Sequence, residues 1–260
     1  GHGGTEVARQ AADVVLADDS FATLVGALVE GRSFWRNIRR ALALLLGGNL
    51  GELGLVVGAS LVGLPSPLVT RQILAVNLIT DALPALAIAM QPPAHNNLAG
   101  LAREGEQAFD RPLRAEMLRR GALSTFPSLA AFILALPGGL PAARAVALAT
   151  IVSTQLGQTL TAGRGVDGLH RPVVLAVLLS GGMLLAGITL PPLRTILAIG
   201  APGPLGWALI GSATATTLVV DRLLPDRQNE QSQRALPEQP ALRMLPSGRG
   251  DGQVASSDER

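Results

Sequence analysis

The chain has 260 residues, of which 48% are apolar and 15% are charged, and its formal net charge is +2. Together with a mean hydropathy of +0.38, this composition is typical of a membrane protein. The absence of cysteine excludes disulfides, thiolate metal sites and cysteine nucleophiles, and the dispersed arginines, with no aromatic-rich basic face beside them, argue against nucleic-acid binding.

Residues 1–33 are soluble in character. Thr5–Ala12 is predicted to be a short helix and Asp13–Ala17 a short buried strand. A second helix is predicted over Phe21–Gly31, with N-cap candidates in Asp18-Asp19-Ser20. This α/β segment is too small to hold a hydrophobic core on its own, so we expect it to be a remnant of a larger domain.

Two apolar stretches follow, 41–62 and 73–90, and each is long enough to cross a hydrocarbon core about 30 Å thick. Both contain polar side chains that lipid disfavours: Asn49, Glu52, Asn77, Thr80 and Asp81. On insertion scales a carboxylate at mid-membrane costs about 2.5–3.5 kcal/mol. We therefore expect both carboxylates to face the protein interior or a wet cavity that holds a cation.

The spacing of these side chains supports a shared site. Asn49 and Glu52 are three residues apart and Asn77 and Asp81 are four apart, so each pair shares a helix face. Pro84 frees a backbone carbonyl one turn earlier, because proline cannot donate a hydrogen bond. Carboxylate, amide and carbonyl oxygens suit hard cations such as calcium, magnesium or sodium. The alternative is that these groups only hydrogen-bond between packed helices.

A tight turn with two prolines, 63–67, joins the two stretches and sets the depth of the carboxylates. At 1.5 Å of rise per residue, Glu52 and Asp81 lie at similar distances from that turn. The sequence therefore predicts that the two carboxylates approach each other across antiparallel helices. Thr80 is expected to turn its hydroxyl or carbonyl oxygen toward the same centre.

Four glycines recur along the first stretch at spacings that place small residues on a helix surface: Gly47, Gly51, Gly54 and Gly58. Small residues let neighbouring helices approach closely within a membrane. We therefore expect a close helix neighbour along this part of the chain.

Four further apolar stretches are predicted to span the membrane: 117–136, 144–162, 172–190 and 205–220. A polar loop, 91–114, precedes them. The tail from about residue 225 is rich in Gln, Pro, Ser and charge and is predicted to be disordered. The sequence thus predicts a mainly α, six-span transmembrane helical bundle.

The arginines orient these spans. With the N-terminus in the cytoplasm, only Arg71, Arg144 and Arg194 fall on the far side of the membrane. This positive-inside bias predicts a multi-pass protein of the plasma membrane with both termini in the cytoplasm.

The fourth span carries Gln155 and Gln158, which share a helix face as Asn49 and Glu52 do. Hydrogen bonding between helices and a supporting role at the cation site are both consistent with these two amides.

Several motifs resemble the P-type cation-transporting ATPases. Residues 4–19 resemble the end of their phosphorylation domain, and Glu30-Gly31-Arg32 with Asn37-Ile38-Arg39 resembles the helix that follows. Asn49-Leu50-Gly51-Glu52 is similar to the family's fifth membrane helix, and residues 77–85 to its sixth. The Thr-Gln-Leu-x-Gln-Thr run that begins at Thr154 resembles the bacterial type called cation-transporting ATPase I.

The resemblance implies a division of the chain and a set of calcium-pump-like ligands. Residues 1–33 are implied to be the C-terminal remnant of a haloacid-dehalogenase-like phosphorylation domain, residues 34–222 the cation-transport domain, and residues 223–260 a cytoplasmic tail. The implied cation ligands are Asn49, Glu52, Asn77, Thr80, Asp81 and Gln155. Gln155 stands where calcium pumps have a glutamate, so one ligand charge is missing and the identity of the cation stays open.

The sequence has no Asp-Lys-Thr-Gly-Thr motif, so the phosphorylated aspartate of the family is missing, as are its nucleotide and actuator domains. We expect no ATP hydrolysis by this chain alone; ATP and magnesium are implied only for a full-length pump. The implied partners are the lipid bilayer and the missing N-terminal domains, whether joined or separately encoded. The alternatives are an ATP-independent channel or carrier and a membrane scaffold that transports nothing.

Overall fold

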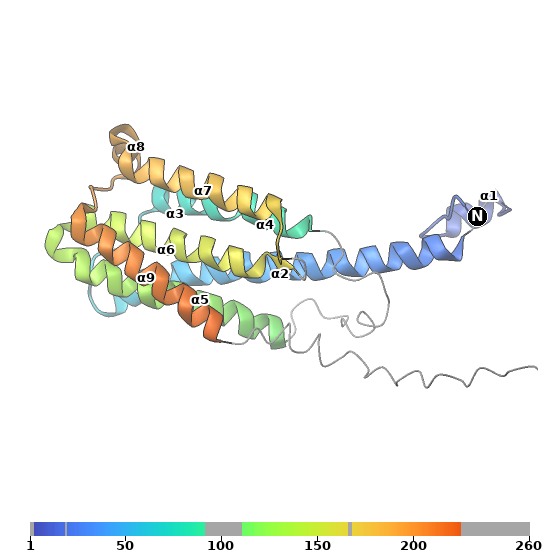
Figure 1. The fold of residues 1–260 in the computed structure, drawn as a ribbon, viewed down its shortest axis with the longest axis horizontal. Helices are drawn as coiled ribbons and strands as arrows, with labels where there is room; N and C mark the ends of the chain where they lie inside the picture. The colour runs from blue at the N-terminus through green and yellow to red at the C-terminus, as the bar shows by residue number, and fades with distance from the viewer. Residues whose placement is uncertain (1–2, 19, 92–110, 166–167, 225–260) are drawn as a thin grey trace, which may run out of the picture.

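The structure, a computed structural model, describes residues 3–18, 20–91, 111–165 and 168–224. Its described part is built mainly from helices (Figure 1). They are α1 (Glu6–Ala11), α2 (Phe21–Leu61), α3 (Thr70–Thr80), α4 (Ala82–Ala89), α5 (Arg111–Ala135), α6 (Leu140–Ala162), α7 (Arg171–Thr189), α8 (Pro191–Leu197) and α9 (Gly203–Leu223). A short 3₁₀ turn (Leu136–Gly138) follows α5, and β1 (Arg164–Gly165) pairs antiparallel with β2 (Gly168–Leu169).

The N-terminal segment differs from its prediction. The helix expected at Thr5–Ala12 is confirmed as α1, and the Thr5 hydroxyl accepts the Ala8 N–H at 3.3 Å. The strand expected at Asp13–Ala17 is wrong, because this stretch is irregular and Val14 is 64% exposed. The described residues therefore show no α/β unit at this end of the chain.

The start of α2 follows the predicted capping pattern in part. Ser20 is the N-cap residue, but its side chain makes no capping hydrogen bond to the first turn of the helix. Instead, the Asp18 carboxylate accepts hydrogen bonds from the Thr23 hydroxyl and the Ser20 N–H. These donors, the Thr23 hydroxyl foremost, lower the pKa of Asp18. Asp19 lies outside the described residues.

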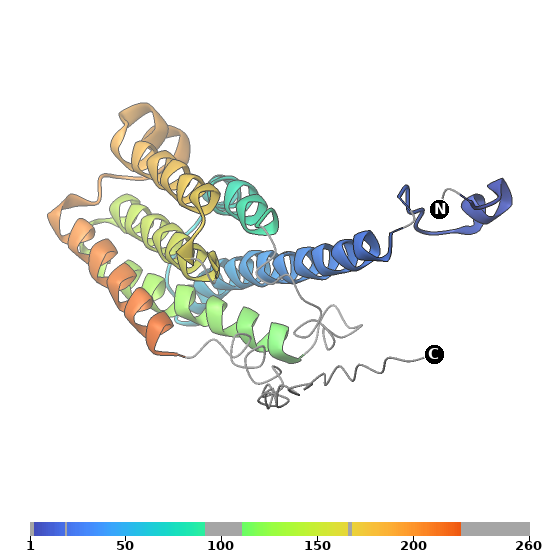
Figure 2. The ribbon, with the colours of Figure 1, turned by 45° about the vertical axis from the view of Figure 1, so that its right-hand side comes forward.

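The helix predicted at Phe21–Gly31 and the apolar stretch predicted at 41–62 form one helix of 41 residues, α2. No proline interrupts the sequence between them, so nothing breaks the backbone hydrogen bonds. The beginning of α2 projects beyond the other helices with α1 at its far end, as two views show (Figures 1 and 2).

Five helical segments in the described residues are long and apolar enough to cross a membrane: α2, α3 with α4, α5, α7 and α9. The predicted spans 117–136, 172–190 and 205–220 coincide closely with α5, α7 and α9. The span predicted at 144–162 is the helix α6. It is long enough to cross a membrane but is not apolar enough to count among these five. The fold is therefore a membrane-type helical bundle with five span-like segments.

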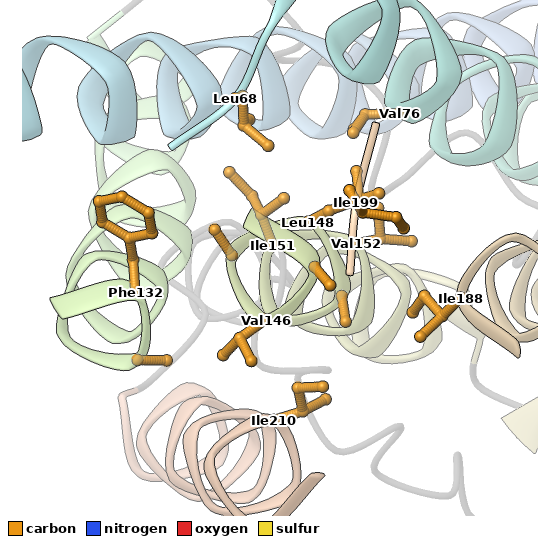
Figure 3. Close-up of a cluster of buried hydrophobic side chains, with 14 of the residues drawn as sticks. Leu68, Val76, Phe132, Val146, Leu148, Ile151, Val152, Ile188, Ile199 and Ile210 are labelled. Atoms are coloured by element: carbon orange, nitrogen blue, oxygen red, sulfur yellow. The ribbon is translucent and has the colours of Figure 1, made fainter. Parts of the chain in front are cut away.

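Helix α6 occupies the centre of this bundle. It packs against α5, α9, α7 and α2, and fifteen of its residues are buried. Figure 3 shows Val146, Leu148, Ile151 and Val152 of α6 between side chains of neighbouring elements. The surrounding residues that the figure labels are Leu68, Val76, Phe132, Ile188, Ile199 and Ile210. A helix so enclosed does not need the apolar surface that lipid requires.

The glycines of α2 form a close seam with α5, as their spacing predicts. A Cβ atom added at Gly47 would lie 2.8 Å from the Arg120 Cβ, and one at Gly51 would lie 2.8 Å from the Ser124 Cβ. Real Cβ atoms do not approach each other this closely, so any larger residue forces the helices apart. The seam therefore sets how far α5 can slide along α2, next to the position of Glu52.

A candidate cation-binding site

Glu52 lies on the buried side of α2, where it meets α6. Its side chain is 5% exposed, and the Gln155 Nε2 donates to its Oε1 at 3.4 Å. The same amide nitrogen donates to the Gly48 carbonyl at 3.2 Å. Gln155 is also buried, so α2 and α6 present a carboxylate and an amide to each other away from water.

The second half of the site is built on an interrupted helix. α3 ends at Thr80 and α4 begins at Ala82, so Asp81 stands at the junction. Pro84 has no N–H to donate to the Thr80 carbonyl, which explains the interruption. The Thr80 hydroxyl donates to the Val76 carbonyl at 2.9 Å and to the Asp81 Oδ1 at 3.1 Å. The hydroxyl thus orients the carboxylate at the junction.

The two halves meet because α2 packs against α4. Glu52 is on α2, and Asp81 stands where α4 begins, so the two carboxylates are on neighbouring helices. Two carboxylates that approach each other across such helices repel unless a cation or a proton lies between them. The structure therefore joins Glu52 to Gln155 by a hydrogen bond and places Asp81 at the start of a helix that packs against α2.

Two buried amide oxygens have no hydrogen-bond donor in the described part of the chain: the Oε1 of Gln155 and the Oδ1 of Asn77. A buried polar atom without a partner costs free energy, so each is a ready acceptor for a cation or a water molecule. No group of three or more His, Cys, Asp or Glu side chains suited to a metal occurs in the described residues. The available chemistry is two carboxylates supplemented by neutral oxygens.

Asn49 does not join this cluster in the described chain. Although it precedes Glu52 by three residues, its side chain is exposed, on the same strip of α2 as the exposed Leu53 and Val57. Of the six cation ligands predicted from the sequence, five are therefore buried or half-buried, and Asn49 is exposed.

Comparisons with known proteins show the family to which the chain belongs. The family model described as "Cation transporting ATPase, C-terminus" matches residues 65–225. The chain belongs to this family. The Mycobacterium leprae (strain TN) protein named "Probable cation-transporting ATPase I" is 35% identical over 253 residues, which cover 87% of this chain and 15% of that protein. The resemblance to this type of ATPase in the motifs is thereby confirmed.

Two calcium-transporting relatives are similar as well. The Bacillus subtilis (strain 168) "Calcium-transporting ATPase" is 36% identical over 233 residues, covering 85% of this chain and 26% of that protein. A "Calcium-transporting ATPase" of Plasmodium falciparum (isolate K1 / Thailand) is 45% identical over 96 residues, covering 37% of this chain and 8% of that protein. This cation ATPase region thus spans only a small part of the length of these relatives.

Next to the candidate site, this region of the ATPase holds a buried ion-pair network that the sequence analysis missed. Its charged members come from α5 and α9: Glu116, Arg119, Arg120 and Asp221. In the sequence, Arg119 and Arg120 indicate only the cytoplasmic side of a span. A lone aspartate near the end of the last apolar stretch was the one signal in the sequence that such a network exists.

Proposed function

We propose that this chain is the membrane transport portion of an ATP-driven cation pump. The proposed cation ligands are Asn49, Glu52, Asn77, Thr80, Asp81 and Gln155. The observation that carries this proposal is the burial of Glu52, bonded to Gln155, on a helix that packs against the helix beginning at Asp81. Two amide oxygens, on Gln155 and Asn77, are buried without a donor among the described residues. Intramembrane carboxylates are costly and are usually functional.

Calcium is the cation that we propose. Two carboxylates supply two negative charges, and neutral amide, hydroxyl and carbonyl oxygens complete the six to eight oxygen ligands that calcium takes. Relatives from two organisms are named calcium-transporting ATPases. Because Asn49 is exposed here, we propose that the remainder of the pump covers this face of α2 and brings Asn49 to the cation.

We propose that residues 1–33 belong to the phosphorylation domain, residues 34–222 to the transport domain and residues 223–260 to a cytoplasmic tail. In this arrangement α6 is the fourth of six spans and is enclosed by the others, and ATP and magnesium bind to the other parts of the pump. Both termini lie in the cytoplasm and the pump lies in the plasma membrane, in keeping with the few arginines that fall on the far side.

Single cysteines test the topology, because the chain has none of its own. Cysteines introduced at Pro65, in the turn before α3, and at Ser232, in the tail, are expected to react with a membrane-impermeant maleimide from opposite sides. Right-side-out and inverted vesicles provide the comparison. Labelling of both positions from one side would contradict the six-span arrangement.

A chimera tests the function. Residues 1–260 replace the matching region of the Bacillus subtilis calcium-transporting ATPase, and ATP hydrolysis is measured in membranes at increasing calcium. We expect calcium-stimulated hydrolysis by the chimera and none by the isolated 260-residue chain. Stimulation by sodium or magnesium but not calcium would overturn the choice of cation. Calcium flux through the isolated chain without ATP would favour a channel or carrier instead.

A further inference from the structure

Gln158 lies one turn beyond Gln155 on α6, and its amide group binds α6 to α5. Its Nε2 donates to the Arg120 carbonyl oxygen at 3.2 Å and to the Ser124 hydroxyl at 3.3 Å. Arg120 returns a hydrogen bond from Nη1 to the Gln158 carbonyl oxygen at 3.2 Å. Gln158 is 1% exposed and Arg120 is 5% exposed, so these bonds are shielded from water and are correspondingly strong.

Arg120 is itself held in place by the ion-pair network. Its Nε lies 2.6 Å from the Glu116 Oε1. Arg119 bridges Glu116 at 2.8 Å and Asp221 at 2.7 Å, and the Thr161 hydroxyl donates to Asp221 at 2.7 Å. Two positive and two negative side chains balance each other, so the network has no net charge. Its effect on its surroundings is therefore to hold side chains in place rather than to exert a long-range electric field.

The same α5 residues contact α2 where it carries Glu52. The backbone of α2 at Gly47 and Gly51 lies directly against the side chains of Arg120 and Ser124. Glu52 is the next residue after Gly51. The contacts that hold α6 on α5 therefore also fix α6 relative to Glu52.

The hydrogen bond that depends on this alignment is the one from Gln155 to Glu52. At 3.4 Å it is at the long end of the range for an N–H···O bond, and such bonds weaken quickly with distance or misalignment. A small slide or rotation of α6 moves Gln155 away from Glu52. Gln158 and Arg120 resist that motion one turn away.

We propose that Gln158 and Arg120 are positioning residues for the cation site. They touch no cation; they hold α6 so that Gln155 orients the Glu52 carboxylate and keeps its own Oε1 at the site. This inference rests on the proposed function, because its consequence is a change in cation affinity.

Gln158→Met tests the inference in the chimera, since methionine has a similar length and cannot make these hydrogen bonds. The half-saturating calcium concentration for ATP hydrolysis is expected to rise about tenfold, as for loss of a group that orients a metal ligand. The maximal rate at saturating calcium is expected to stay close to that of the unchanged chimera. Arg120→Lys, which keeps the charge and a donor, is expected to shift the concentration less than Arg120→Leu.

Thr154→Val is the matched control. Thr154 is buried on the same helix, and its hydroxyl donates to the carbonyl of its own-helix neighbour Ile151 at 2.8 Å. Its replacement is therefore expected to leave the half-saturating calcium concentration unchanged. If Gln158→Met fails to accumulate in membranes, Ser124→Ala removes one of the same bonds and is expected to raise that concentration about two- to fivefold.

A lower maximal rate with unchanged half-saturation in these variants would mean that the residues serve only the packing of the helices, and would overturn the inference. An unchanged chimera that shows no dependence on calcium would contradict the proposed function itself. The two failures are thus distinguishable in one set of measurements.

Discussion

Asp81→Asn is expected to abolish calcium-stimulated ATP hydrolysis in the chimera at every calcium concentration below the millimolar range. Asp81 is one of the two carboxylates of the proposed site, and it stands at the junction of α3 and α4. Asparagine keeps the size and one oxygen but removes the charge, and calcium affinity is tuned chiefly by the number of charged ligands. ATP hydrolysis at stepped calcium concentrations, with the amount of inserted protein measured in parallel, checks this result.

Asp221→Asn is the control for charge removal. Asp221 is also a buried carboxylate, but its partners are Arg119 and Thr161 rather than the candidate site. We expect this variant to be less stable and, because Asp221 belongs to the network that holds Arg120, to raise the half-saturating calcium concentration about two- to fivefold at most. Calcium-stimulated hydrolysis is expected to persist, in contrast to its loss in Asp81→Asn. Ordinary calcium dependence in Asp81→Asn would remove Asp81 from the proposed ligands.

The carboxylates and the helices were predictable because both follow from local physical constraints. A carboxylate in an apolar stretch is costly in a membrane, so Glu52 and Asp81 stand out in the sequence without any knowledge of the fold. Apolar runs of sufficient length also predict the positions of α5, α7 and α9. The glycine seam was predictable for a similar reason, because small residues at regular spacing indicate a close neighbour.

Other features depend on tertiary contacts that local patterns do not contain. The run Asp13–Ala17 is apolar enough for a buried strand, yet no strand pairs with it among the described residues, and short apolar runs are ambiguous by periodicity alone. Asn49 shares a helix face with Glu52 by spacing, but its exposure depends on which helices are present beside α2. Arg119 and Asp221 are 102 residues apart, so no local pattern shows that they pair.

The ion-pair network is expected to make a large contribution to the integrity of the bundle, and Glu116→Ala tests it. Glu116 is buried and accepts hydrogen bonds from Arg119 at 2.8 and 2.9 Å, while its Oε1 also lies against Arg120. Alanine at position 116 leaves Arg120 buried without its carboxylate. Breaking one partner of a buried ion pair costs about 3–5 kcal/mol, and we expect a loss of this size in the free energy of unfolding of the 260-residue chain.

Titration of the purified chain with sodium dodecyl sulfate measures this loss, with helicity as the signal. Glu30→Ala, at an exposed position of α2, is the matched control and is expected to change the free energy by less than about 0.5 kcal/mol. The double variant Glu116→Ala with Arg120→Leu removes both charges of the pair and leaves Arg119 with Asp221. Because an apolar replacement of a buried pair is often tolerated, we expect it to be more stable than Glu116→Ala alone. A double variant as unstable as the sum of its single variants would show that the cost comes from lost packing and not from an unpaired buried charge.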